Sequence, residues 1–246
     1  NTSTFTMAGN NPTSGTGLWS IISGSATITN ASLYNTTVTG VAAGASVTLR
    51  WTISNGVCSN STDDVVISNN ALPTTAAAGA DQEQCNNGSF TLAGNTPTTG
   101  TGAWTVVSGT ATITSASSPT SSVTGVPLGT SATLRWTISN GVCTPSTDDV
   151  VLTNSYPPDV ANAGTDQANC QSGNFTLAGN NPANGTGAWT VISGTATITT
   201  PSAYNSTVTG VPAGTSATLR WTITNGTCTP TTDDVVLTNS NPPTTA

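Results

Sequence analysis

The chain has 246 residues, of which only 5% are charged, and its formal net charge is −7 with three arginines and neither lysine nor histidine. Binding to nucleic acid or to an anionic lipid surface requires clustered cations, so this charge excludes both classes of partner. No apolar run approaches the roughly 20 residues that span a bilayer, so we expect no membrane insertion of this segment.

The sequence repeats itself three times at an interval of 85 residues, without insertion or deletion. Trp19, Trp104 and Trp189, for example, stand in register. A fixed period of this length predicts one folded unit copied head to tail, with neighbouring repeats as its partners. The copies begin and end at arbitrary points of the period, which suggests a segment of a longer protein. We place the units at 1–72 (truncated at its N-terminus), 77–156 and 162–241, with linkers at 73–76, 157–161 and 242–246.

Strand signals are clearest in the second copy. In chain order, we expect strands at 81–85, 90–93, 103–107, 110–114, 121–124, 132–138 and 148–153. In the strand at 132–138, Leu134 and Trp136 point to one face and Arg135 to the other, and Asn140-Gly141 then predicts a hairpin turn. About seven short strands without helical periodicity predict an all-β fold of tandem immunoglobulin-like antiparallel β-sandwiches.

Two tryptophans recur in each copy on the apolar phase of their strands. We expect all six to anchor the cores of the units and not to stack on a ligand, because each shares its strand face with aliphatic side chains. They are Trp19, Trp51, Trp104, Trp136, Trp189 and Trp221.

The five cysteines also follow the period. Cys85 and Cys143 are 58 residues apart, as are Cys170 and Cys228, so we predict a disulfide within each complete unit, between its first strand and its last hairpin. The expected partner of Cys58 would immediately precede the segment. Zinc is the competing interpretation, but two cysteines per unit without histidine cannot supply four ligands. Disulfides indicate an oxidising compartment, and hence a secreted extracellular protein.

An aspartate pair recurs before the last apolar run of each copy: Asp63-Asp64, Asp148-Asp149 and Asp233-Asp234. Neighbours on a strand point to opposite faces, so the carboxylates cannot converge for catalysis, and we expect no enzyme. Arg135 is expected to pair with Asp148 or Asp149. The alternative is a calcium site, which would need further oxygens from carbonyls or from acids such as Asp81 and Asp166. No other cofactor is expected.

Three runs of the second copy resemble a known repeat type. They are Gly-Thr-Gly-Ala-Trp-Thr-Val-Val-Ser-Gly-Thr-Ala-Thr-Ile at 100–113, Leu-Arg-Trp-Thr-Ile-Ser-Asn-Gly-Val-Cys at 134–143 and Ser-Thr-Asp-Asp-Val-Val at 146–151. They are similar to the immunoglobulin-like (PKD-like) repeats of giant Bacteroidetes cell-surface proteins, such as gliding-motility adhesins. The resemblance covers all three copies, and it implies secretion and display at the cell surface as a long fibre.

Two functional classes therefore remain. The first is the stalk of a cell-surface adhesin, which spaces or presents a binding region; the short proline-containing linkers favour such an extended rod. The second is a subunit of an extracellular filament, with identical chains as partners. A carbohydrate-binding module, with surface polysaccharide as its partner, is a weaker alternative: Tyr34 and Tyr204 recur in one loop, but Pro119 and Thr120 stand in that region of the second copy.

Overall fold

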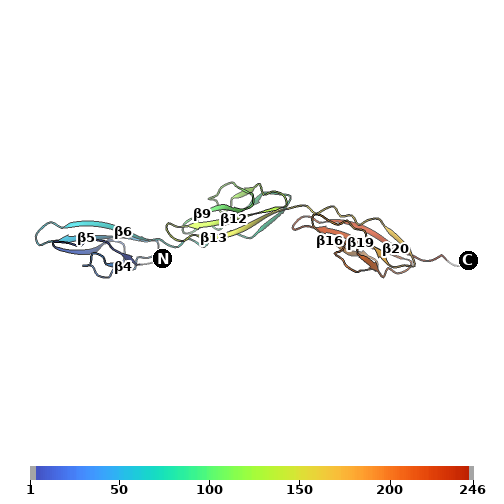
Figure 1. Ribbon diagram of the computed structural model, residues 1–246, viewed down its shortest axis with the longest axis horizontal. Helices are drawn as coiled ribbons and strands as arrows, with labels where there is room; N and C mark the ends of the chain where they lie inside the picture. The colour runs from blue at the N-terminus through green and yellow to red at the C-terminus, as the bar shows by residue number, and fades with distance from the viewer. Residues whose placement is uncertain (1–3, 244–246) are drawn as a thin grey trace.

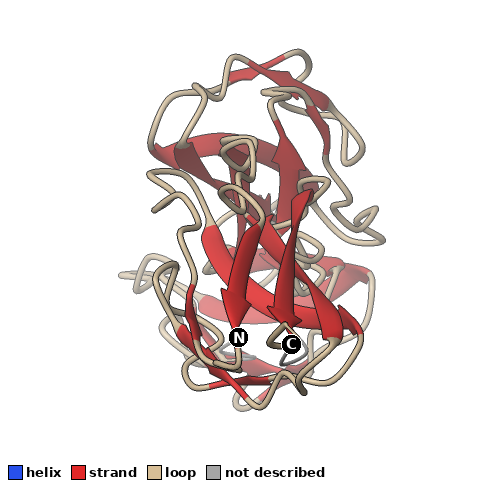
Figure 2. Ribbon diagram, turned by 90° about the vertical axis from the view of Figure 1, so that its right-hand side faces the viewer, coloured by secondary structure: helices blue, strands red, loops and turns tan. Residues whose placement is uncertain are grey.

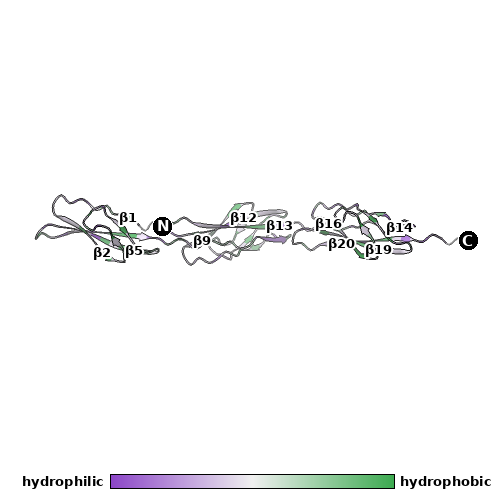
Figure 3. Ribbon diagram, turned by 90° about the horizontal axis from the view of Figure 1, so that it is seen from below, coloured by the Kyte–Doolittle hydropathy of each residue, from purple (hydrophilic) through white to green (hydrophobic). Residues whose placement is uncertain are grey.

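The computed structural model describes residues 4–243, and all regular elements in this range are β-strands (Figure 2). Within the same range, no helix could cross a membrane. The three units follow one another along one long axis, and the rod is extended in two perpendicular views (Figure 1 and Figure 3). Its shape is the one expected for tandem units that contact their sequence neighbours.

The strands recur with the period of the sequence. The first unit contains β1 (Phe5–Thr6), β2 (Thr16–Ser23), β3 (Thr27–Ile28), β4 (Thr37–Thr39), β5 (Ala45–Ser54) and β6 (Ser61–Asn69). The second contains β7 (Gln82–Cys85), β8 (Phe90–Thr91), β9 (Thr101–Ser108), β10 (Thr112–Ile113), β11 (Ser122–Thr124), β12 (Thr130–Ser139) and β13 (Ser146–Ser155). The third contains β14 (Gln167–Cys170), β15 (Phe175–Thr176), β16 (Thr186–Ser193), β17 (Thr197–Ile198), β18 (Thr207–Thr209), β19 (Thr215–Thr224) and β20 (Thr231–Ser240).

Each unit is a sandwich of a small and a large sheet. The small sheets have the orders β1-β4-β3, β8-β11-β10 and β15-β18-β17. The large sheets are β7-β13-β12-β9 in the second unit and β14-β20-β19-β16 in the third, whereas the first has the three strands β2-β5-β6. Pairing is antiparallel except that β7 and β14 run parallel to β13 and β20. The prediction of an all-β, immunoglobulin-like tandem array is confirmed.

The core of each unit lies between its two sheets and is built around a tryptophan pair. In the second unit, Trp104 on β9 faces Trp136 on β12, with ring centroids 5.0 Å apart. A Cβ atom on Gly102 would lie 2.1 Å from the Trp136 ring, so a glycine is required at this position. The six tryptophans assigned to the cores, two in each unit, are all buried: Trp19, Trp51, Trp104, Trp136, Trp189 and Trp221.

The segments expected to be linkers belong in part to the folded units. Ala76 and Ala78 are buried in the core of the second unit, and the amide of Ala76 donates a hydrogen bond to Ser146 Oγ. Ala161 and Ala163 are buried in the same way in the third unit. The linkers placed at 73–76 and 157–161 are therefore too long, because their last residues already pack in the next sandwich. The linker expected at 242–246 extends beyond the described residues.

Candidate functional site: the junctions between units

A disulfide crosses the second junction. It joins Cys85, the last residue of β7, to Cys228 in the turn between β19 and β20 of the third unit. The two Cα atoms are 5.0 Å apart, which lies within the usual range for disulfides. The bond encloses a sequence separation of 143 residues and links the end of one sandwich to the start of the next.

The predicted pairings Cys85–Cys143 and Cys170–Cys228 are therefore wrong. β7 runs parallel to β13, so Cys85 lies beside Ser155 at the end of β13, whereas Cys143 precedes the start of that strand. Ten strand residues at about 3.3 Å each separate the two ends of the unit by roughly 30 Å. A disulfide within the unit could not span this distance.

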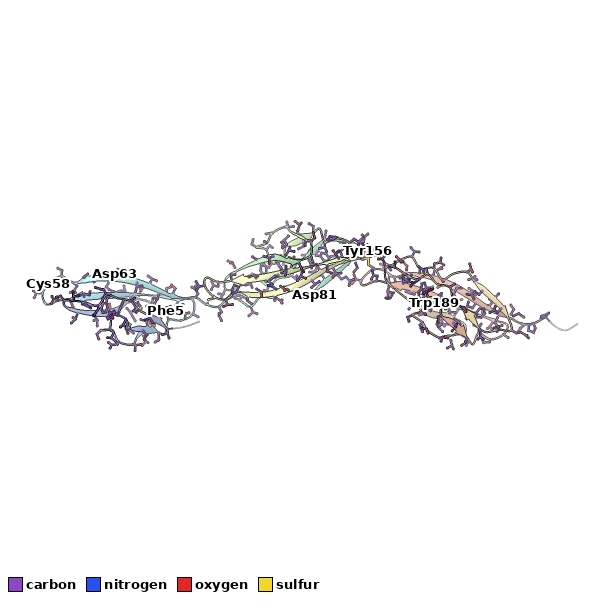
Figure 4. The ribbon with its side chains drawn as sticks, in the orientation of Figure 1. Phe5, Cys58, Asp63, Asp81, Tyr156 and Trp189 are labelled. Carbon is purple, nitrogen blue, oxygen red and sulfur yellow. A yellow bond between two sulfur atoms is a disulfide. The ribbon has the colours of Figure 1, made fainter. Side chains whose placement is uncertain are left out.

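The remaining cysteines are equivalent to the bonded pair: Cys58 and Cys143 occupy the repeat position of Cys228, and Cys170 occupies that of Cys85. Cys58 occupies the hairpin of the first unit, at the far end of the rod from the second unit (Figure 4). The partner expected for Cys58, immediately before the segment, lies outside the described residues. Cys58 and Cys170 are both exposed thiols. Cys143 lies at the first junction, with its Sγ atom 3.3 Å from the carbonyl oxygen of Ala71.

The second junction also has non-covalent contacts. Asn225 in the hairpin of the third unit donates a hydrogen bond of 2.8 Å from its side-chain amide to the carbonyl oxygen of Tyr156. Figure 4 shows Tyr156 at this junction. The hydroxyl of Thr227 lies 3.4 Å from the carbonyl oxygen of Glu83 on β7. The hairpin of each complete unit is thus seated against the end of the preceding unit.

The first junction repeats this arrangement. The side-chain amide of Asn140 donates a hydrogen bond of 2.8 Å to the carbonyl oxygen of Ala71, which is the position equivalent to Tyr156. The hairpin glycines fit closely against the preceding unit. A Cβ on Gly141 would lie 2.3 Å from Asn70, and one on Gly226 would lie 1.7 Å from Glu83. Both glycines have positive φ, so the turn and the close approach both favour glycine.

The entering segment is held differently at the two junctions. At the second, the Asp159 carboxylate accepts hydrogen bonds from the backbone amides of Ala183 and Asn184. The hydrogen bond from the Ala183 amide lowers the pKa of Asp159 most, and hydrogen bonds from the side-chain and backbone amides of Asn184 lower it further. At the first junction, Thr74 occupies the equivalent position, and its hydroxyl accepts from the amides of Thr98 and Thr99.

The two aspartates of each pair make different interactions. Asp149 binds Arg135 with two hydrogen bonds of 2.7 and 2.8 Å, and these bonds lower the pKa of Asp149. Asp148 points to the other side of the strand, where its Oδ2 accepts a hydrogen bond of 2.7 Å from the Ala78 amide. Arg50–Asp64 and Arg220–Asp234 repeat the exposed ion pair.

The acids proposed as calcium ligands are therefore dispersed. Asp233 holds the entering segment through the Ala163 amide, as Asp148 does in the second unit. Asp81 and Asp166 accept from the backbone amides of Val151 and Val236. Within residues 4–243, no three acidic or cysteine side chains are grouped so that they could hold a metal ion.

The tyrosines considered for carbohydrate binding are partly exposed. Tyr34 and Tyr204 are 36% and 40% exposed. Their backbone carbonyls accept hydrogen bonds from the indoles of Trp19 and Trp189. The carbonyl of Pro119 does the same for Trp104, so this loop supports the core even where the tyrosine is absent.

No family model and no curated protein matches the chain. Among solved structures, a three-immunoglobulin fragment of titin is 11% identical, with 92% of this chain and 88% of that chain covered and a TM-score of 0.44. Immunoglobulin domains 1–4 of Sidekick-1 are 13% identical, with 96% and 72% covered and a TM-score of 0.44. The insect immune protein hemolin is 14% identical, with 97% and 76% covered and a TM-score of 0.31.

Proposed function

We propose that this chain is a stalk segment of a long, secreted cell-surface adhesin, where it holds a binding region away from the cell. The observation that carries the proposal is the disulfide across the second junction, between Cys85 and Cys228. A bond in this place fixes the direction in which one unit follows the next. Such a bond suits a rod that functions through its length and stiffness.

The position of the disulfide also shields the units from tension. A force applied along the chain reaches Cys85, crosses the sulfur bridge and leaves at Cys228, so the backbone between the two cysteines carries little of the load. This protected loop comprises most of the second and third units. A stalk needs this property, because extension by unfolding would lower the force transmitted to its tip.

An extracellular location fits the same bond. Disulfides persist in oxidising compartments and are rare in the reducing cytosol. The exposed faces of the long strands are rich in threonine and serine and each has one arginine–aspartate pair, which suits an exposed fibre. Display at the cell surface is also what the resemblance to Bacteroidetes surface repeats implies.

Single-molecule pulling from the two termini tests the stalk proposal. In the oxidised protein, the loop of 143 residues cannot lengthen, so reduction should add about 500 Å to the fully unfolded length at about 3.3–3.6 Å per residue. The Cys58→Ser variant is the matched control, because it removes a thiol outside the bond and should extend like the parent. Equal lengths before and after reduction would contradict the proposal.

A filament of identical chains is the second candidate. It is favoured by the exposed thiols of Cys58 and Cys170, which are the equivalents of the bonded Cys228 and Cys85. A head-to-tail contact of this kind does not close and gives a linear polymer. Under mild oxidation, electrophoresis without reductant should then show a ladder of multimers, and Cys58→Ser should abolish it. A protein that stays monomeric under these conditions would exclude this route to a filament.

A further inference from the structure

The second and third units each present an Asn-Gly dipeptide to the unit before them. Asn140-Gly141 lies in the hairpin between β12 and β13, and Asn225-Gly226 lies in the hairpin between β19 and β20. In both hairpins, the carbonyl oxygen of the asparagine accepts a hydrogen bond from the amide of the cysteine three residues later, at 3.1 and 3.0 Å. The dipeptide therefore begins a tight turn, and this turn is the part of the unit that contacts its neighbour.

The junction leaves no room for a side chain after the asparagine. Gly141 and Gly226 have φ values of 56° and 48°, a region that residues with a Cβ rarely adopt. Both glycines also lie so close to the preceding unit that an added Cβ would clash, with Asn70 at the first junction and with Glu83 at the second. The turn and the contact between units thus both require the sequence Asn-Gly at this place.

The same missing side chain makes the asparagine chemically vulnerable. Asparagine is a thermolabile residue, because the backbone nitrogen of the next residue can attack its side-chain carbon Cγ. A glycine has no Cβ to hinder this attack. A bond forms between the glycine nitrogen and Cγ, the bond from Cγ to Nδ2 breaks, and ammonia leaves with the proton of the glycine amide. Water then opens the resulting succinimide to aspartate or isoaspartate, so the net reaction consumes one water and releases one ammonia.

The hydrogen bond across each junction opposes this reaction. Nδ2 of Asn140 donates to the carbonyl oxygen of Ala71, and Nδ2 of Asn225 donates to that of Tyr156, both at 2.8 Å. Both asparagines are half-buried at the contact. The side-chain amide must leave this bond before Cγ can turn onto the glycine nitrogen. An asparagine in contact with the preceding unit is therefore protected from deamidation.

At the second junction, the disulfide adds to this protection. Cys228 follows Asn225 by three residues in the same turn, and its bond to Cys85 ties the turn to the preceding unit. A turn that is tied in this way separates from its neighbour less often. Because the reaction requires the separated state, its rate follows the population of that state.

Deamidation removes the donor on which the contact depends. An ionised aspartate has only acceptor oxygens, and the backbone carbonyl opposite is also an acceptor. Two acceptors that face each other repel, so the product cannot re-form the hydrogen bond to Ala71 or to Tyr156. At the second junction, the carboxylate of Glu83 lies against Gly226, so the new negative charge is placed close to an existing one. The change is permanent, because the ammonia is lost.

We propose that Asn140 and Asn225 are deamidation sites that are protected while the units are in contact and react when a junction opens. Each opening can then be converted into a lasting loss of contact between two units. This inference rests on the hydrogen bonds and close contacts at the junctions, and it does not depend on the stalk function.

The test incubates the whole oxidised chain at mildly alkaline pH and follows each asparagine by peptide mass spectrometry. Synthetic peptides with the sequences of residues 136–142 and 221–227 contain the same Asn-Gly pairs without a neighbouring unit. Asn140 and Asn225 should react at least about fivefold more slowly in the chain than in the peptides, the factor that corresponds to one net hydrogen bond. Equal rates in chain and peptides would overturn the proposal.

A pair of cysteine variants separates protection by the junction from protection by the fold of the unit. Cys85→Ser removes the disulfide from the side of the preceding unit and leaves the hairpin sequence intact. It should raise the rate at Asn225 several-fold and leave the rate at Asn140 unchanged. Cys170→Ser changes the equivalent cysteine of the third unit, which is outside the bond, and should alter neither rate. An unchanged rate at Asn225 in Cys85→Ser would overturn the proposal.

The effect of the product on the junction is tested with Asn140→Asp. Spin labels on the first and second units should show a broader distribution of distances in this variant than in the parent chain. Asn87→Asp is the matched control, because it adds the same charge to the same unit at an exposed asparagine. The side-chain oxygen of Asn87 accepts a hydrogen bond of 3.0 Å from the Ser89 amide, and an aspartate can accept it equally. A distribution that Asn140→Asp leaves unchanged would contradict the proposed loss of contact.

Discussion

The two junctions share a hydrogen bond from the hairpin of the following unit, but a disulfide crosses only the second within the described residues. At each, a hairpin asparagine donates a hydrogen bond of 2.8 Å to the chain leaving the preceding unit, Asn140 to Ala71 and Asn225 to Tyr156. Only the second junction adds the bond between Cys85 and Cys228. The hydrogen-bonded contact of the hairpin with the preceding unit therefore sets the direction of the rod. The disulfide fixes an orientation that this contact already determines.

The largest expected effect comes from removing the disulfide between Cys85 and Cys228 with Cys228→Ser. The bond closes a loop of 143 residues, and in the chain-entropy model its loss costs about 5 kcal/mol. Calorimetry should therefore show earlier melting of the second and third units, while the first unit melts as before. Cys58→Ser is the control and should leave the whole curve unchanged. An unaltered melting curve for Cys228→Ser would show that the bond does not stabilise these units.

A second substitution tests the stability of a single unit, as opposed to the stability of the contact between units. Trp136 is fully buried, so Trp136→Ala should cost roughly 3–5 kcal/mol of the free energy of unfolding and unfold the second unit. Denaturant titration followed by circular dichroism measures this loss. Arg135→Ala, on the exposed face of the same strand, is the control and should cost far less, because exposed ion pairs contribute little. A stable, folded Trp136→Ala variant would contradict the assignment of the core.

A smaller effect should distinguish the two junctions directly. Asn140→Ala and Asn225→Ala each remove one hydrogen bond, worth about 1 kcal/mol net. We expect the first junction to become more mobile and the second to stay fixed, because the disulfide still holds it. Spin labels on adjacent units, measured by electron paramagnetic resonance, report the spread of distances across each junction. Equal broadening in both variants would show that the disulfide does not restrict the angle.

The smallest effect is a difference in pH dependence. The folded-state pKa of Asp159 is lowered, so its contribution is present above its unfolded pKa, near 3.9, and is lost as pH falls through the folded value. Below pH 4, the amides of Ala183 and Asn184 should therefore lose protection from hydrogen exchange. The amides of Thr98 and Thr99, held by the neutral Thr74 hydroxyl, should not. Asp159→Asn should remove this difference in pH dependence.

The strands and the core could be predicted from the sequence because they depend on local patterns. Alternation along 132–138 places Trp136 inside and Arg135 outside, and the structure has both in these positions. The aspartates also follow this rule, which separates Asp148 from Asp149. The Asn140-Gly141 hairpin similarly lies where the turn chemistry places it.

The disulfide could not be predicted in this way. A strictly periodic sequence gives every Cys85-to-Cys143 pair the same spacing, but it gives Cys85-to-Cys228 pairs a constant spacing too, one period longer. The choice depends on whether the first strand ends near its own hairpin or near the next one. That is decided by the parallel pairing of β7 with β13, a long-range feature with no local signal.

The segments that enter the second and third sandwiches were also hidden in the sequence, and they were assigned in part to linkers. Burial of Ala76 and Ala78 is what shows that these segments belong to the sandwich. Their small apolar side chains at every second position were the available signal, since period-two alternation marks a strand with one buried face.

Small-angle X-ray scattering of the oxidised chain tests the central claim, that three seated units form a rod, most directly. Three sandwiches of about 35–45 Å each should give a maximum dimension on the order of 120 Å. A compact globule of the same number of residues would measure only about 50–65 Å. A value near 120 Å supports the rod seen in Figure 1, and a value near 65 Å would mean that the units fold back on one another and that the account is wrong.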